Sequence, residues 1–99
     1  MKEFEEILRI LKEHKDELVK KYKVKEIGLF GSYVRRENKE KSDVDVLVEF
    51  KPEAKISLLD FIEIEIYLSE LLGERVDLVE KSGLKPRIGK YILQEVIYL

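Results

Sequence analysis

The segment GLFGSYVRRENKEKSDVDVLVEF, residues 28–50, carries the strongest structural signal in the chain. Its last eight residues, 43–50, alternate in polarity with the period of a β-strand that buries one face. One face would carry Val44, Val46, Val48 and Phe50, and the other Asp43, Asp45, Leu47 and Glu49. Asp43 and Asp45 would then point the same way about 7 Å apart, two rises along the strand. Two like charges on one face repel, so we expect a positive charge close to them.

The first part of the segment predicts a phosphate-binding turn. Residues 25–30, KEIGLF, have the composition of a short buried strand, which Gly31 would end. Ser32 is placed to cap a helical turn over YVRREN. A glycine lets the backbone approach a phosphate closely, and a helix start offers free N–H groups and a positive dipole end. Arg35, one turn later, would add a fixed cation for phosphate oxygens.

The rest of the chain predicts three further helices and one further strand. Residues 3–22 have an apolar stripe at helical spacing, and ERVDLVE, residues 74–80, predicts a strand. Residues 61–68, FIEIEIYL, alternate like a strand, but the Ser57–Asp60 capping box, the length and Gly73 favour a helix over 57–72. That helix has apolar residues on more than one face, for the core or for a partner. RIGKYILQEVIYL, residues 87–99, predicts a final helix.

Composition places the chain in the globular class. It has 99 residues, 44% hydrophobic and 40% charged, and we interpret residues 1–99 as one α/β (α+β) domain. The net charge of −2 gives no general attraction to nucleic acid or to anionic lipid. The absence of cysteine excludes disulfides and thiolate chemistry. No segment has the apolar run of a signal peptide or of a membrane span, so we expect a cytoplasmic protein.

Three aspartates at strand positions suggest a divalent cation site. Asp77, on the strand 74–80, would join Asp43 and Asp45 if the two strands were neighbours. Carboxylate oxygens of this kind select Mg²⁺ or Mn²⁺. Two such ions could polarise an attacking hydroxyl and a phosphoryl group together. A Gly-Ser pair or an Asp-x-Asp motif alone is common, but the ordered combination of all these features is specific.

The segment LFGSYVRRENKEKSDVDVLVEF resembles the signature of the DNA polymerase β-like nucleotidyltransferase superfamily. It is most similar to minimal nucleotidyltransferases, the MntA-type antitoxins that pair with HEPN toxins. The resemblance spans nearly the whole chain, including Ser42-Asp43-Val44-Asp45, the Asp77 strand and the ending EVIYL. The family motif has the form Gly-Ser-x-Ala-Arg-Gly, so that Val34 replaces its alanine and Arg36 its second glycine.

This resemblance implies a fold, an activity and a set of site residues. The fold would be a small mixed sheet of about three strands flanked by helices. The activity would be Mg²⁺-dependent transfer of AMP from ATP to a hydroxyl, with tyrosine the expected acceptor, of a HEPN toxin that is thereby silenced. The catalytic and metal-binding residues would be Asp43, Asp45 and Asp77. The nucleotide-binding residues would be Gly31, Ser32, Arg35 and Ser42.

Two other functions remain open beside the one that the resemblance implies. The chain could neutralise a toxin by binding without catalysis, through the surplus apolar residues of the helix over 57–72. It could also act on a small molecule or RNA, although RNA binding would favour a more basic surface. Arg36, Lys39 and Lys41 could contact phosphates or a partner, but a solvated charged loop is the simpler interpretation.

Overall fold

A four-stranded sheet forms the centre of the molecule. The computed structural model describes residues 2–99, and its strands are β1 (Val24–Phe30), β2 (Val44–Phe50), β3 (Val76–Glu80) and β4 (Ile97–Tyr98). The strand order is β3-β2-β1-β4. β1 pairs antiparallel with both β2 and β4, whereas β2 and β3 are parallel. The sheet is therefore mixed, as predicted, but it has one strand more than expected.

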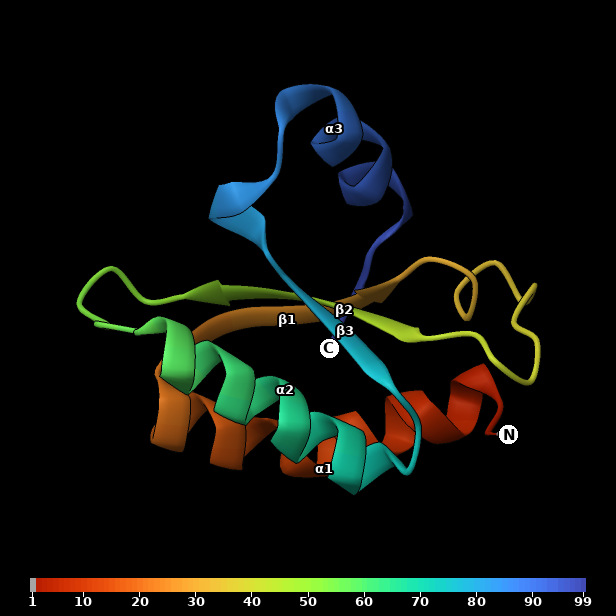
Figure 1. Ribbon diagram of the computed structural model, residues 1–99, viewed down its shortest axis with the longest axis horizontal. Helices are drawn as coiled ribbons and strands as arrows, with labels where there is room; N and C mark the ends of the chain where they lie inside the picture. The colour runs from red at the N-terminus through yellow and green to blue at the C-terminus, as the bar shows by residue number, and fades with distance from the viewer. Residues whose placement is uncertain (1) are drawn as a thin grey trace.

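The helices lie on both sides of this sheet. α1 (Phe4–Tyr22) and α2 (Leu58–Leu72) lie together beneath the sheet in Figure 1, and α3 (Pro86–Glu95) stands on the opposite side. A single 3₁₀ turn, Lys81–Gly83, links β3 to α3. Within residues 2–99, no helix is both long enough and apolar enough to span a membrane.

The core lies between the sheet and the α1–α2 layer. The apolar alternation predicted for β2 is confirmed, because Val44, Val46 and Val48 are all buried against the helices. Leu47, on the other face, is buried as well. Asp45 and Glu49 on that face are only partly buried. The sheet face that carries the aspartates is thus the one turned away from the main core.

The segment over 57–72 is a helix, which confirms the prediction that rested on its ends. Ser57 Oγ accepts from the Asp60 N–H at 3.1 Å, and Asp60 Oδ2 accepts from the Ser57 N–H at 3.0 Å. Gly73 ends the helix in the left-handed region, with φ 66°. The capping box satisfies two backbone N–H groups at the start of the helix, and Gly73 ends it. These local signals outweigh the strand-like alternation of residues 61–68.

The prediction of a final helix reaching residue 99 is wrong. α3 ends at Glu95, Val96 is extended, and Ile97–Tyr98 forms β4 against Gly28 and Leu29 of β1. The Leu99 N–H continues this edge by donating to the Ile27 carbonyl at 3.0 Å. Residues 96–98 are β-branched or aromatic, which favours a strand, and the edge of β1 offers them hydrogen-bonding partners that the helical pattern of the sequence does not reveal.

The close approach of β4 depends on Gly28. A Cβ at this position would lie 2.7 Å from Val96 Cγ2 and 3.0 Å from the Ile97 carbonyl oxygen. We expect Gly28→Ala to lower the free energy of unfolding by about 1–3 kcal/mol, since overpacking forces the backbone to shift. Urea unfolding measures the loss, and amide exchange should show β4 opening first. Wild-type protection of β4 in the variant would contradict this packing.

Candidate active site

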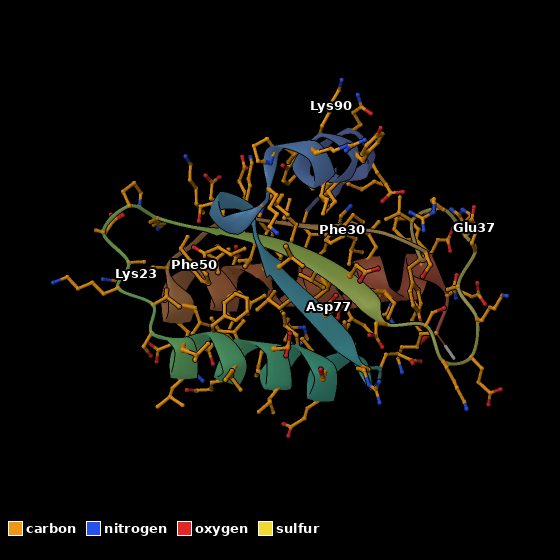
Figure 2. All side chains as sticks on the ribbon, turned by 45° about the horizontal axis from the view of Figure 1, so that its top comes forward. Lys23, Phe30, Glu37, Phe50, Asp77 and Lys90 are labelled. Atoms are coloured by element: carbon orange, nitrogen blue, oxygen red, sulfur yellow. The ribbon has the colours of Figure 1, made fainter. Side chains whose placement is uncertain are left out.

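The strand register brings two of the predicted aspartates side by side. Asp45 of β2 pairs directly with Asp77 of β3, on neighbouring parallel strands. Such strands lie about 4.8 Å apart, and the two side chains leave the sheet on the same face. Asp43 lies just before β2, where its Oδ1 is 3.9 Å from Arg75 Nε. Figure 2 shows Asp77 on β3; its neighbours Val76 and Leu78 are buried in the core, so Asp77 lies on the opposite face of the strand.

The Gly31 turn lies directly against Asp45. Phe30, the last residue of β1, is the register partner of Asp45, so Gly31 follows at the same level of the sheet. Gly31 has φ 80°, and a Cβ on it would lie 2.0 Å from Asp45 Oδ2. Only glycine fits this position without displacing the carboxylate. The structure thus joins the predicted phosphate turn to the predicted carboxylate pair.

The residues after Gly31 form one irregular turn instead of the predicted helix start. The Arg35 N–H donates to the Gly31 carbonyl at 3.1 Å, and the Glu37 N–H to the Ser32 carbonyl at 2.8 Å. A single turn aligns few peptide dipoles, so the expected positive dipole end contributes little here. The Gly31 N–H and the Arg35 guanidinium of this turn both contact a carboxylate, that of Glu95.

Glu95 is a site residue that the sequence analysis did not single out. The Gly31 N–H donates to Glu95 Oε2 at 2.8 Å, and Arg35 Nη1 lies 2.6 Å from Glu95 Oε1. These bonds, with the positive charge of Arg35, hold the pKa of the Glu95 carboxyl below its ordinary value, against the effect of burial. One signal was available, because a carboxylate in the last turn of a helix opposes the helix dipole and needs another partner.

Burial and neighbouring negative charges raise the pKa of the Asp45 and Asp77 carboxyls. Burial, and after it the negative charges of Asp77 and Asp43, raises the pKa of the Asp45 carboxyl to about 6, although Arg35 opposes this. Burial also raises the pKa of Asp77, as do the charges of Glu65 and Asp43. The protein's own cations therefore leave the repulsion at Asp45 only partly compensated. A bound cation would complete the compensation.

The donor chemistry of this site fits Mg²⁺, which the fold family implies. Asp43, Asp45 and Asp77 supply only hard carboxylate oxygens, the ligands that Mg²⁺ prefers. As the side chains of residues 2–99 stand, no three of these or other acidic, histidine or cysteine groups converge on one metal position. Asp45 and Asp77 are nevertheless neighbours on one face, so rotation of their side chains is the movement that shared ligation would need.

The raised pKa of Asp45 predicts a stability effect that depends on pH. Above pH 6 the folded chain carries a charged Asp45 whose ionisation is disfavoured. A pKa higher in the folded than in the unfolded chain makes stability fall as pH rises from about 4 to about 6. In the presence of chelator at pH 7, the free energy of unfolding of Asp45→Asn should therefore be about 1–2 kcal/mol higher than that of the wild type. Partial exposure of the carboxylate to solvent keeps this difference small.

Chemical denaturation of both proteins between pH 3.5 and 8 measures this difference. The advantage of Asp45→Asn should fade as the pH falls below 6, because the wild-type carboxyl then takes up its proton. An advantage that is the same at every pH would show that the effect comes from packing and not from charge.

The other predicted residues lie around the edge of the site. Ser42 Oγ accepts from the Lys39 N–H at 2.7 Å, so it closes a turn of the charged loop. Its role in nucleotide binding stays a prediction. Arg36 pairs with Glu5 and lies over the Phe4 ring at 5.4 Å, which attaches the turn to α1. Its φ of 58° matches the left-handed conformation that a glycine in the family motif would adopt freely.

The comparisons with known proteins agree with this geometry. The profile of the nucleotidyltransferase domain matches residues 11–99. The chain belongs to this family. It is 60% identical over 95 residues, 96% of this chain and 94% of the relative, to the protein adenylyltransferase MntA of Thermococcus cleftensis. This nucleotidyltransferase is an enzyme of the family by that match, and it has the fold that the resemblance implied.

Solved structures show the same fold. One, provisionally described as a minimal nucleotidyltransferase, superposes with a TM-score of 0.81 at 37% identity, covering 99% of this chain and 97% of the other. A complex of a tri-AMPylated Shewanella oneidensis HEPN toxin with an MNT antitoxin matches with a TM-score of 0.60 at 20% identity, over 96% of this chain and 66% of that one. At that identity the second likeness concerns the fold alone.

Proposed function

We propose that this nucleotidyltransferase transfers AMP from ATP, with Mg²⁺, to a hydroxyl of a HEPN toxin, and so acts as its antitoxin. The observation that carries the proposal is the Asp45–Asp77 pair lying against the Gly31 turn. A relative 60% identical is named a protein adenylyltransferase, and a structural neighbour is an antitoxin bound to an AMPylated HEPN toxin. Tyrosine is the acceptor that we expect.

Asp43, Asp45 and Asp77 would hold the metal. Bound Mg²⁺ supplies positive charge against the phosphate oxygens and polarises the acceptor hydroxyl. The high proton affinity of Asp45 and Asp77 without metal is consistent with this role, since a cation relieves the cause of both shifts. One ion or two would serve, and Mn²⁺ has the same ligand preference.

The chain's own groups would orient the nucleotide and move one proton. The Gly31 N–H, the Ser32 hydroxyl and the Arg35 guanidinium would bind triphosphate oxygens. The acceptor oxygen would attack the α-phosphorus, the bond to the oxygen bridging to the β-phosphate would break, and pyrophosphate would leave. The acceptor proton would pass to Asp77. Asp77 is exposed, so an acceptor presented on another protein could reach it.

Labelled ATP tests the reaction type. The chain would be mixed with Mg²⁺ and a HEPN-domain protein encoded beside its gene, with ATP labelled at either the α- or the γ-phosphate. We expect label on the partner from α-labelled ATP only, because transfer of AMP releases the γ-phosphate in pyrophosphate. Label from γ-labelled ATP would indicate a kinase, and label from neither would contradict transfer to that partner.

A binding-only antitoxin is the second candidate, because α2 exposes an apolar surface. Its outward side chains are Leu58, Leu59, Ile62 and Ile66. Exposed apolar groups gathered on one helix are typical of an interaction surface. If binding alone neutralises the toxin, Asp43→Asn would still protect cells while Ile62→Glu would not. If transfer is required, Asp43→Asn would fail to protect.

A further inference from the structure

Two groups that we propose to bind phosphate, the Gly31 N–H and the Arg35 guanidinium, both contact the carboxylate of Glu95. Glu95 accepts from the Gly31 N–H through Oε2 at 2.8 Å and pairs with Arg35 through Oε1 at 2.6 Å. The side chain of Glu95 is 22% exposed and that of Arg35 is 48% exposed, so solvent reaches the ion pair. Charge-assisted hydrogen bonds are shorter and stronger than neutral ones.

A carboxylate in this position makes the contacts that a phosphate oxygen pair would make. Both are oxyanions, and both accept from a backbone N–H and a guanidinium at the same distances. The Gly31 N–H has one hydrogen, so it cannot bind Glu95 and a phosphate oxygen well at the same time. Arg35 also pairs with Glu37, at 3.3 Å, but its shorter bond is to Glu95.

We propose that Glu95 is an exchangeable occupant of the phosphate site, which the triphosphate of the nucleotide must displace. This inference rests on the proposed function, because it takes the Gly31 turn as the triphosphate site. Glu95 thereby sets the affinity for ATP: it keeps the turn and Arg35 ordered, and it lowers the apparent affinity by the free energy of its own two contacts. The nucleotide then binds to two donors that are already in position, but part of its binding free energy is used to break their contacts with Glu95.

The backbone around Glu95 favours movement of its side chain over movement of α3. Glu95 is the last residue of α3, and the chain continues at once into β4, which is paired to β1. A hollow of about 460 Å³ adjoins the carboxylate, and it reaches from Gly31 and Arg35 to the α3 side chains Ile88 and Tyr91. Figure 2 shows Phe30 close to α3, on the side of the sheet opposite α1 and α2. The displaced carboxylate has this open space to rotate into.

Charge supplies the reason for displacement. Glu95 Oε2 accepts from the Gly31 N–H, and Gly31 lies directly against Asp45, so the charge of Glu95 adds to the negative charge of the carboxylate site. A polyphosphate entering with its cation brings charge balance of its own, whereas Glu95 left in place would repel it. The exchange thus replaces one anion on the two donors by another.

Binding of Mg²⁺–ATP and of Mg²⁺–tripolyphosphate to Glu95→Gln tests the proposal by calorimetry. Glutamine keeps the size of the side chain but loses the ion pair with Arg35, so we expect about tenfold tighter binding of both ligands. Glu95→Asp, which is too short to span both donors, should fall between the two. In turnover, the KM for ATP should fall by a similar factor. Glu13→Gln, an exposed carboxylate of α1, is the control for net charge.

The outcomes separate this inference from the function beneath it. Weaker binding by Glu95→Gln would show that Glu95 orients Arg35 for the phosphate, and unchanged binding would show that it does not compete; either overturns the exchange. In both cases, wild-type binding that is lost in Arg35→Ala would leave the proposed triphosphate site standing. Binding that is unaffected by Arg35→Ala would contradict the site itself and the exchange with it.

Discussion

Asp45→Asn should lower the rate of AMP transfer by at least about 10³-fold while the fold is retained. Asp45 lies at the meeting point of the site, beside Asp77 in the sheet and against the Gly31 turn. The amide keeps the shape of the side chain but removes the negative charge that would hold the metal. Initial rates of label transfer at saturating ATP measure the loss, and thermal unfolding in chelator confirms that the variant is folded.

Asp43→Asn and Asp77→Asn should also be strongly impaired, and Asp16→Asn is their matched control. Asp16 is an exposed aspartate of α1, on the far side of the sheet from the site. We expect Asp77→Asn to lose about 10²–10⁴-fold, the range typical of a missing proton acceptor. Unimpaired transfer by Asp45→Asn would refute the assignment of the carboxylates, whatever the other variants did.

Gly31→Ala should cost both activity and stability, because the added methyl group has no place to go. Its Cβ would lie 2.0 Å from Asp45 Oδ2, and its φ of 80° is unfavourable for any L-residue with a side chain. The backbone strain alone amounts to about 1–2 kcal/mol. Asp45 must also turn away, and a displacement of about 1 Å is enough to lose about 100-fold in rate. Denaturant unfolding and the transfer rate measure the two effects.

Gly83→Ala provides the comparison for a glycine without such constraints. Apart from Gly83 and its chain neighbours, no atom of residues 2–99 lies within 4 Å of a Cβ at position 83. We therefore expect a wild-type free energy of unfolding and a transfer rate within about twofold of wild type. If Gly31→Ala behaved like Gly83→Ala, the contact between the turn and Asp45 would not matter to the reaction.

The sequence predicted the parts of the fold that local chemistry determines. The alternation over residues 43–50 was sufficient for β2, and the capping box at Ser57 with Gly73 was sufficient for α2. The end of the chain could not be predicted in this way. Residues 96–99 continue the apolar pattern of a helix, but in the structure β4 pairs with the backbone groups at the edge of β1. That choice depends on a contact nearly 70 residues away in sequence, which no local pattern records.

The site shows the same division between local and distant information. Asp43, Asp45 and the Gly31 turn stand in one continuous segment, so their spacing could be interpreted directly. Asp77 required the assumption that its strand is the neighbour of β2, and the parallel register confirms this. Glu95 reaches Gly31 only because β4 folds back along β1. A prediction that continued the helix to residue 99 had no means of placing it there.

The mass of the partner protein tests the central claim most directly. The HEPN-domain protein would be incubated with ATP, Mg²⁺ and either the wild-type chain or Asp45→Asn. Its intact mass would be measured by mass spectrometry before and after. The account predicts a gain of one or more AMP units with the wild-type chain, on a hydroxyl side chain, and no gain with the variant. A partner of unchanged mass that is nonetheless bound and neutralised would contradict catalysis by the three aspartates.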